Sequence, residues 1–210
     1  MNNIKTALCV VCAFIAATLS FTACSDKEEA GEYDNWKARN DQFLDSIAKV
    51  AKANADGKWV VCQSYTLGDD TGLYEDDPQN FIYMHYIEKS QNTQAPMYND
   101  SVRVHYIGRL IPSDQHPAGY CFGKSSSTTT FNEETDVPTL LGVNGNNTGF
   151  ITALLYLHEG DHVQLYIPYG LGYGVSEYIS ASIPAYSTLI YDLKLAKIYR
   201  FKIDGDTSWY

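Results

Sequence analysis

The chain has 210 residues, of which 45% are hydrophobic, and its formal net charge is −10. This length predicts one domain with extensions and is sufficient for a hydrophobic core. The excess of acidic residues argues against a nucleic-acid-binding protein, because a phosphate backbone requires clustered Lys and Arg. It also argues against electrostatic docking on anionic lipid. The 17 tyrosines favour a β-rich fold with aromatic surfaces.

The first 23 residues have the pattern of a secretory signal. Lys5 supplies the positive charge, residues 7–19 form an apolar run that is short for a membrane span, and small residues precede Cys24. The pattern resembles a bacterial lipoprotein signal, with cleavage before Cys24 and lipid on its sulfur. The alternative is an ordinary signal peptide with an incidental cysteine. We expect the lipid to hold the domain at a membrane without a transmembrane helix.

A tether and a helix are predicted between the signal and the first strand. Residues 24–33 are charged and predict an extended tether, which is either a solvated linker or similar to the acidic run that marks some Gram-negative lipoproteins for the cell surface. Residues 34–56 predict a helix capped by Asp34. Its apolar face consists of Trp36, Phe43, Ile47, Val50 and Ala51. We expect this face to pack on the following domain of a monomer, and a coiled-coil dimer is the alternative.

Three strands are predicted next, from runs of β-branched and aromatic residues. They are residues 58–65, 81–88 and 101–111. The acidic, turn-rich residues 68–79 predict a loop. His105 and Tyr106 are neighbours on the third strand, so their side chains point to opposite faces of the sheet. We therefore interpret His105 as a structural residue and not as a catalytic base.

A mostly irregular segment and a short helix follow. Residues 112–136 predict a loop with one short strand at 120–122. Residues 149–157 predict a helix that ends with Gly160 as its C-cap. The expected buried face of this helix is Phe150, Ala153, Leu154 and Leu157.

Residues 160–195 contain two further strands around an aromatic loop. The runs at 163–167 and 188–193 alternate with a period of two and predict strands. The loop between them carries almost no charge and contains Tyr169, Tyr173, Tyr178 and Tyr186. Tyrosine combines an apolar ring with a polar tip, which suits the wall of a binding cleft. Some of these rings are expected to cover the edge of the core instead.

Two separated motifs resemble one protein family. The first is V-x-V-H-Y-x-G-x-L at residues 102–110, and the second comprises G-D-x-V-x-L-x-I-P, L-G-Y-G and I-P-x-x-S-T-L-I-Y-D-x-K-L within residues 160–195. In this order they are similar to FKBP-type peptidyl-prolyl cis-trans isomerases over residues 101–198. The resemblance implies an α+β fold, in which a curved antiparallel β-sheet wraps around one short α-helix, here with an N-terminal helical extension.

The resemblance also implies a proline-binding pocket. Its floor is Phe150, and its walls are Tyr106, Phe122, Ile183 and Tyr191, with Val137 as a further wall residue. Tyr173 is expected to donate its hydroxyl, and Asn147 its backbone N–H, to the bound peptide. Three departures from the family pattern occur: Gly123 replaces an acid, Phe150 replaces a Trp, and Asn146 and Asn147 replace an apolar pair.

Such a pocket requires no nucleophile, metal or cofactor. Resonance gives rotation about a peptide bond a barrier of roughly 18–20 kcal/mol, and twisting the bond leaves the carbonyl less polar. A dry aromatic pocket therefore favours the twisted state over the planar one. The sequence shows no hydrolase, Walker or dinucleotide motif, and its five histidines have no metal-binding spacing. We expect no cofactor.

Two cysteines, Cys62 and Cys121, remain after the signal and the proposed anchor are set aside. In an oxidising compartment, a disulfide and two buried thiols are equally good interpretations.

The sequence thus predicts a peptidyl-prolyl cis-trans isomerase that acts on X-Pro bonds of envelope or secreted proteins. The alternatives are a non-catalytic FKBP-like lipoprotein that binds a peptide or partner, and a carbohydrate-binding surface lipoprotein. The expected partners are proline-containing polypeptides and a membrane, reached only through the lipid, at the periplasmic or surface side of the outer membrane. The predicted boundaries are 1–23 for the signal, 24–33 for the tether, 34–56 for the helix, 57–203 for the FKBP-like domain and 204–210 for a tail.

Overall fold

The computed structural model describes residues 31–67 and 77–200. The predicted signal, Cys24, most of the tether, most of the 68–79 loop and the 204–210 tail lie outside the described residues. The helices are α2 (Trp36–Ala53) and α3 (Thr148–Tyr156). The strands are β1 (Trp59–Gln63), β2 (Phe81–Glu88), β3 (Ser101–Arg109), β4 (Cys121–Lys124), β5 (Thr139–Gly142), β6 (His162–Ile167) and β7 (Leu189–Tyr199). The described residues also include four short 3-10 helices: η2 (Pro78–Asn80), η3 (Val143–Gly145), η4 (Tyr169–Leu171) and η5 (Ile179–Ala181).

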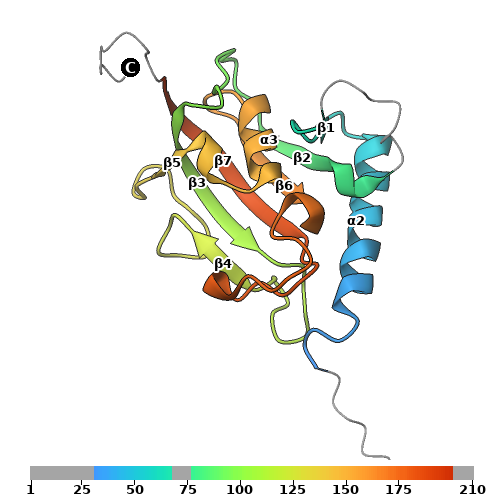
Figure 1. Ribbon diagram of the computed structural model, residues 1–210. Helices are drawn as coiled ribbons and strands as arrows, with labels where there is room; N and C mark the ends of the chain where they lie inside the picture. Colours follow the sequence, from blue (N-terminus) through green and yellow to red (C-terminus); the bar gives the residue numbers. More distant parts are fainter. Residues whose placement is uncertain (1–30, 68–76, 201–210) are drawn as a thin grey trace, which may run out of the picture. The chain divides into compact units, whose positions relative to one another are not determined.

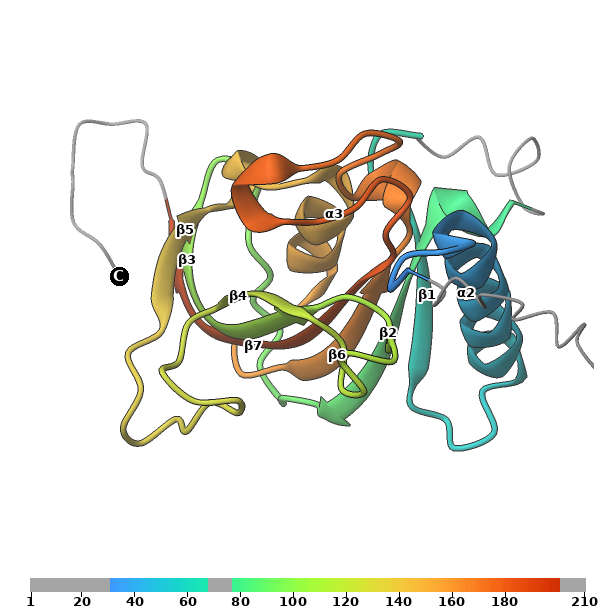
Figure 2. The same cartoon turned by 90° about the horizontal axis from the view of Figure 1, so that it is seen from below.

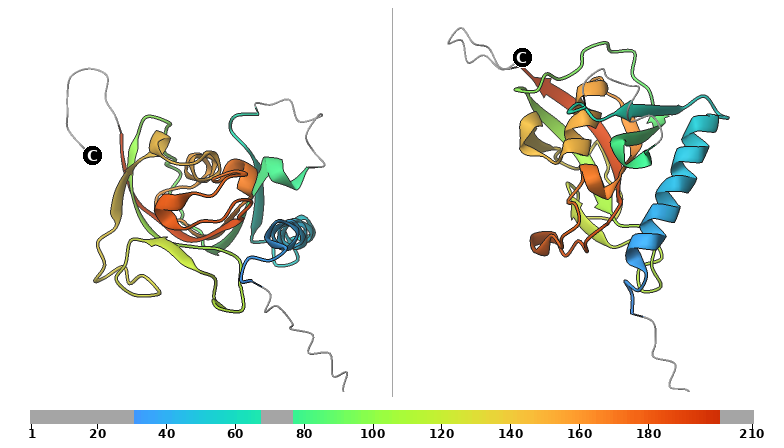
Figure 3. Two further views of the ribbon diagram at one scale, coloured as in Figure 1. Left: turned by 60° about the horizontal axis from the view of Figure 1, so that its bottom comes forward. Right: turned by 45° about the vertical axis from the view of Figure 1, so that its right-hand side comes forward.

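The strands form one antiparallel sheet that curves around α3, which confirms the predicted α+β fold (Figures 1 and 2). The strand order is β1-β2-β6-β7-β3-β4, and β5 also pairs with β3. The end-on view in Figure 3 shows α3 inside the curve and α2 outside it. This arrangement gives the sheet a concave face against α3 and a convex face on the other side.

Side chains alternate between the two faces along each strand, and the apolar ones on the concave face form the core. Val163, Leu165 and Ile167 on β6 are all fully buried, two residues apart, as a period of two requires. The predicted apolar face of α3 is buried against them: Phe150, Ala153, Leu154 and Leu157. The C-cap of α3 is Leu157 and not Gly160, so that prediction is wrong. Gly160 has a positive φ of 96° in the turn that follows, and its N–H donates to the Leu195 carbonyl at 2.7 Å.

Both faces of β2 are covered, because α2 packs on the side opposite to α3 (Figure 2). Ile82 and Met84 belong to the concave core, whereas Tyr83 packs with Leu44 and Ala51 of α2. The sequence pattern of β2 is correspondingly apolar on both faces.

The face of α2 that packs on the sheet includes four of the five predicted residues: Trp36 and Ala51 are buried, and Phe43 and Ile47 pack against the core. Its buried residues are Trp36, Asn40, Leu44 and Ala51. Val50, expected on that face, is 52% exposed, because the helix is rotated toward Asn40 and Leu44. The N-cap is Asn35, in a left-handed conformation and without a side-chain capping bond, so the predicted cap at Asp34 is also wrong. No helix within residues 31–67 and 77–200 is long and apolar enough to cross a membrane.

Cys62 and Cys121 are both free thiols, which excludes the disulfide that the sequence left open. Cys62 lies on β1 and Cys121 on β4, at opposite ends of the strand order. Burial raises the pKa of the Cys62 thiol to about 12, so this thiol is unreactive at neutral pH.

A polar cluster covers the convex face of β3, β6 and β7. His105 is buried there and stacks on Phe131, with ring centroids 5.1 Å apart. Lys194, the register partner of His105 on β7, forms ion pairs with Glu88 at 2.9 Å and with Glu133 at 2.7 Å. His105 therefore faces away from the concave side of the sheet.

Burial of His105 predicts a loss of stability in mild acid. Desolvation is the largest influence and lowers its pKa, the nearby Glu133 and Asp136 carboxylates oppose this shift, and Lys194 and His162 add to it. An unfolded His protonates near pH 6.5, so below about pH 6.5 the unfolded state binds more protons than the folded state. The free energy of unfolding should fall as the pH drops through this value. Urea denaturation between about pH 7.5 and pH 5.5 should show a shallower pH dependence for His105→Gln than for the wild type, and equal slopes would contradict this.

Candidate active site

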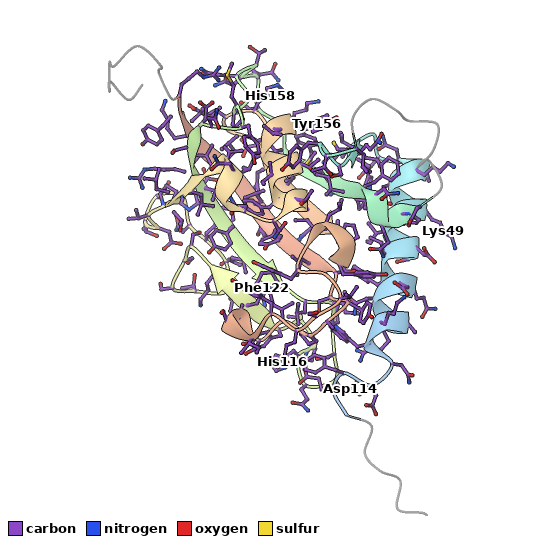
Figure 4. The ribbon with its side chains drawn as sticks, viewed as in Figure 1. Lys49, Asp114, His116, Phe122, Tyr156 and His158 are labelled. Atoms are coloured by element: carbon purple, nitrogen blue, oxygen red, sulfur yellow. The ribbon has the colours of Figure 1, made fainter. Side chains whose placement is uncertain are left out.

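A cavity of about 440 Å³ opens on the concave side, between β3, β4, β7, the start of α3 and a long loop. We call this loop, residues 169–188, the wall loop. Six of the eight pocket residues expected from the sequence line the cavity: Tyr106, Phe122, Asn147, Phe150, Tyr173 and Tyr191. Figure 4 shows Phe122 where β4 approaches the wall loop.

Tyr191 lies at the centre of an aromatic cluster in this cavity. Its ring contacts Phe150 edge-on, with centroids 5.1 Å apart at 68°, and Phe122 edge-on at 5.4 Å and 88°. The centroid of the Tyr106 ring lies 6.3 Å from that of Tyr191, with the rings tilted by 55°. Edge-to-face contacts at these separations are favourable and hold the rings in defined positions. The cavity thus has a preformed aromatic lining.

Gly108 makes this cluster possible. It is the register partner of Tyr191 on β7, and of Gly123 on β4. A Cβ atom at position 108 would lie 2.5 Å from Cε2 of Phe122 and 2.8 Å from Cε1 of Tyr191. Both rings therefore occupy the space that a side chain at this position would need.

The floor of the cavity is held by the start of α3. Asn147 is the N-cap, and its side-chain oxygen accepts a hydrogen bond from the Phe150 N–H at 2.9 Å. The Asn146 side chain donates to the carbonyls of Gly142 and Val143, at 2.9 and 3.3 Å. Both asparagines, which depart from the family's apolar pair, thus fix the backbone that leads to Phe150.

Four tyrosines and two asparagines supply the polar side chains of the cavity. Tyr173 is half-buried and stacks on Tyr178, with centroids 4.2 Å apart at 14°. Burial is the largest influence on Tyr173 and raises its pKa, and hydrogen bonding with the side chains of Asn147 and Tyr191 opposes this shift. Burial likewise raises the pKa of Tyr106 and, much further, that of Tyr191. These phenols are therefore neutral at physiological pH and can act as hydrogen-bond donors.

The structure does not bring the other two predicted residues to the cavity. Ile183, within the wall loop, is buried in the hydrophobic core, and its N–H and carbonyl both pair with Tyr178. Val137 is 74% exposed in the segment before β5.

Sequence reasoning did not assign Leu141, Tyr178 and Ala181, which also line the cavity. Tyr178 was among the four tyrosines that the sequence singled out in the loop. Leu141 lies on β5, a strand of four residues that the sequence did not predict, and Ala181 lies on a 3-10 turn with no distinctive sequence signal.

Within the described part of the chain, no three His, Cys, Asp or Glu side chains lie close enough together to hold a metal ion. The cavity itself is lined by aromatic, amide, aliphatic and glycine residues. Its chemistry is therefore that of a hydrophobic site with a few hydrogen-bond donors.

Comparison with known proteins identifies relatives of this arrangement. Residues 92–196 match the profile of the family described as FKBP-type peptidyl-prolyl cis-trans isomerase. The chain is 33% identical over 121 residues to the macrophage infectivity potentiator of Trypanosoma cruzi, covering 58% of this chain and 54% of that protein. It is 37% identical over 103 residues to the FKBP-type 22 kDa peptidyl-prolyl cis-trans isomerase of Escherichia coli K12, covering 49% and 43%. The chain thus spans about half the length of these curated relatives.

Solved structures share the fold. A peptidyl-prolyl cis-trans isomerase from Pseudomonas syringae pv. tomato superposes with a TM-score of 0.54 at 19% identity, over 80% of this chain and 96% of that one. FkpA from Escherichia coli superposes with a TM-score of 0.53 at 21% identity, over 93% and 71%. At these identities the likeness concerns the fold alone, whereas the profile match covers half of the chain. The chain belongs to the FKBP-type peptidyl-prolyl cis-trans isomerase family.

Proposed function

We propose that this protein catalyses cis-trans isomerisation of X-Pro peptide bonds in envelope or secreted polypeptides. The observation that carries the proposal is the preformed aromatic cavity around Tyr191, in a chain that belongs to a family of prolyl isomerases. Its volume of about 440 Å³ suits a small cyclic side chain with its flanking peptide groups.

The aromatic lining provides the rate acceleration in this proposal. The proline ring rests on Phe150, between Tyr106, Phe122 and Tyr191. Water is excluded there, and the planar peptide bond, which is the more polar state, is disfavoured relative to the twisted one. The barrier to rotation is roughly 18–20 kcal/mol. The lining lowers it because it binds the transition state more tightly than the ground state.

Two donors orient the peptide in this mechanism. The Tyr173 hydroxyl donates to a substrate carbonyl, which burial supports because it keeps the phenol neutral. The Asn147 backbone N–H, at the N-cap of α3, has no acceptor among the described residues and is available to a second carbonyl. Neither group needs to transfer a proton, so the reaction requires only binding and orientation.

Removing the Tyr173 hydroxyl should have a modest effect. A single hydrogen bond contributes about 0.5–1.5 kcal/mol, so kcat/KM of Tyr173→Phe should fall by about 2- to 10-fold. The measurement is the isomerisation rate of a proline tetrapeptide. Tyr98→Phe is the matched control, because Tyr98 packs on Tyr65 with ring centroids 5.9 Å apart and does not line the cavity. Equal rates for Tyr173→Phe and the wild type would exclude a role for this hydroxyl.

A second candidate function is binding of proline peptides without catalysis, and the absence of an acid at Gly123 favours it. A Cβ atom there would make only ordinary contacts, 3.6 Å from Cε2 of Tyr106 and 3.8 Å from its hydroxyl. Gly123→Asp therefore introduces a carboxylate without a steric clash at its Cβ atom. A wild type that binds proline peptides but does not accelerate isomerisation, together with a gain of rate in Gly123→Asp, would establish the binding function.

We also propose that the domain is held at the cell envelope by lipid on Cys24. The support is the sequence of residues 1–24, an n-region, an apolar run and small residues before the cysteine. In this proposal residues 24–33 are a tether, and the protein is a monomer, because α2 packs its apolar face on its own domain.

Changing the proposed lipid attachment site should release the protein from membranes. Cys24→Ser in a bacterial host should yield a soluble or unprocessed species, since one thioether-linked lipid group supplies the membrane affinity. Membrane fractionation with mass spectrometry of the N-terminus provides the measurement. Cys121→Ser is the control and should stay with the membrane fraction. A Cys24→Ser protein that remains membrane-bound in mature form would rule the anchor out.

A further inference from the structure

The wall loop is closed by its own turns and ring contacts and not by pairing with the sheet. It contributes Tyr173, Tyr178 and Ala181 to the cavity, yet it contains no strand of the sheet. Its internal hydrogen bonds include one from the Tyr186 N–H to the Gly174 carbonyl at 3.0 Å, which closes its base. Tyr186 itself has a positive φ of 62°, a conformation that costs free energy for a residue with a side chain. The base of the loop therefore needs support from its surroundings.

Asn40 of α2 provides part of this support. Its side chain is completely buried, and its oxygen accepts a hydrogen bond from the Thr188 N–H at 2.7 Å, at the end of the wall loop. Its side-chain nitrogen donates to the Trp36 carbonyl at 2.8 Å. A buried amide is costly unless both groups are paired, so this arrangement fixes the loop relative to the helix.

Trp36 makes a second connection one helical turn earlier. Its indole N–H donates to the Ser187 hydroxyl at 2.8 Å, and that hydroxyl donates to the Pro184 carbonyl at 2.7 Å. These two hydrogen bonds connect α2 to residues 184–187, near the end of the wall loop. The bond from Trp36 is buried, so water does not replace a lost partner there, and the bond from Ser187 to Pro184 is part-buried.

Lys37 adds a contact on the outer side of the same base. Its ammonium lies 5.7 Å from the ring centroid of Tyr169 and 5.6 Å from that of Tyr186, within the range of cation–π attraction. The two rings pack edge-on with centroids 5.3 Å apart. The first and last turns of the wall loop are thus held together beneath one helix.

We propose that Trp36 and Asn40 are positioning residues for the cavity, although no residue of α2 lines it. By holding the base of the wall loop, they set the place of Tyr173 and Tyr178 relative to the aromatic cluster on the sheet. Peptide binding at the cavity therefore depends on the N-terminal helix, which is a part of the site and more than a spacer. The effect on substrate binding rests on the proposed isomerase function, whereas the effect on the loop does not.

The test compares four variants with a control in the same helix. Asn40→Ala removes the acceptor of the Thr188 N–H, Trp36→Phe removes the indole N–H together with part of the ring, and Ser187→Ala removes the hydroxyl partner of that N–H. Trp36→Phe with Ser187→Ala completes a double-mutant cycle. Ile47→Ala is the control, because Ile47 packs in the cluster of Leu44, Ala51 and Tyr83 on β2.

Two readouts on the full-length chain in mild detergent separate positioning from general stability. The first is hydrogen exchange at the amides of Gly174 and Tyr186, which close the loop base. Asn40→Ala and Trp36→Phe should raise this exchange about tenfold more than Ile47→Ala does, the factor expected from one lost buried hydrogen bond. The second is the kinetics of a proline tetrapeptide, for which KM should rise about 3- to 10-fold with kcat changed much less. In the double-mutant cycle, the effects of Trp36→Phe and Ser187→Ala on exchange and on KM should be non-additive.

The outcomes distinguish the two proposals. Exchange and KM that change no more in Asn40→Ala and Trp36→Phe than in Ile47→Ala would overturn the positioning role. Additive effects in the Trp36 and Ser187 cycle would overturn the connection through their hydrogen bond. A wild type without isomerase activity would remove the proposed function, and the exchange comparison would still decide whether α2 holds the loop.

Discussion

Phe150→Ala is expected to lower the free energy of unfolding by about 3–5 kcal/mol and to remove most of the isomerase activity. Phe150 is buried, and its ring packs edge-on against Tyr191. Truncation removes the floor of the cavity and leaves a void next to the central ring of the cluster. The proline ring then has no surface to rest on, and water can reach the bond that must rotate. Urea denaturation and kcat/KM of a proline tetrapeptide provide the two measurements.

Leu157→Ala is the matched control for this variant. Leu157 is fully buried at the other end of α3 and does not line the cavity, so its truncation should cost about 2–5 kcal/mol of stability and leave kcat/KM close to that of the wild type. Assays at a temperature where both variants are folded separate activity from stability. Similar kcat/KM values for the two variants would mean that Phe150 serves the core and not the reaction.

Gly108→Ala is the second change with a large expected effect. The added Cβ would lie 2.5 Å from the Phe122 ring and 2.8 Å from the Tyr191 ring, and Tyr191 is only 5% exposed. At least one ring must move, which costs about 1–3 kcal/mol as overpacking and displaces a wall of the cavity. We expect a lower free energy of unfolding and a loss of activity of the order of tenfold or more, since misplaced groups reduce rates steeply.

The register partner of Gly108 provides a control at the same level of the sheet. Gly123 lies opposite on β4, and the nearest atom to a Cβ there is 3.6 Å away. Gly123→Ala should therefore leave the free energy of unfolding nearly unchanged, and urea denaturation of the two variants should diverge. If Gly108→Ala behaved like Gly123→Ala, the account of the aromatic cluster as a tightly packed unit would be wrong.

The spacing of apolar residues along the sequence was sufficient to predict the main strands and the short helix. The prediction for β2 at residues 81–88 agrees with the structure at both ends, because its apolar residues are bounded by polar turns. The opposite orientation of His105 and Tyr106 also followed from strand geometry alone, and the structure places them on opposite faces of β3.

The features that the sequence could not predict depend on partners far along the chain. Asn40 is buried because its acceptor satisfies the Thr188 N–H, 148 residues away, which a polar residue in a helical pattern does not signal. The four-residue β5 forms only by pairing with β3 and so escaped prediction, together with Leu141 on the cavity wall. Ile183 was predicted as a wall residue, but its backbone pairing with Tyr178 turns it into the core.

The most direct test of the proposed function is the rate at which the purified protein interconverts the cis and trans forms of an X-Pro tetrapeptide. NMR exchange spectroscopy measures this rate without a coupling protease. We predict an acceleration that is proportional to protein concentration, saturates with peptide, and is lost in Phe150→Ala but not in Leu157→Ala. An interconversion rate equal to that of the peptide alone, at protein concentrations where peptide resonances shift on binding, would contradict catalysis at this cavity.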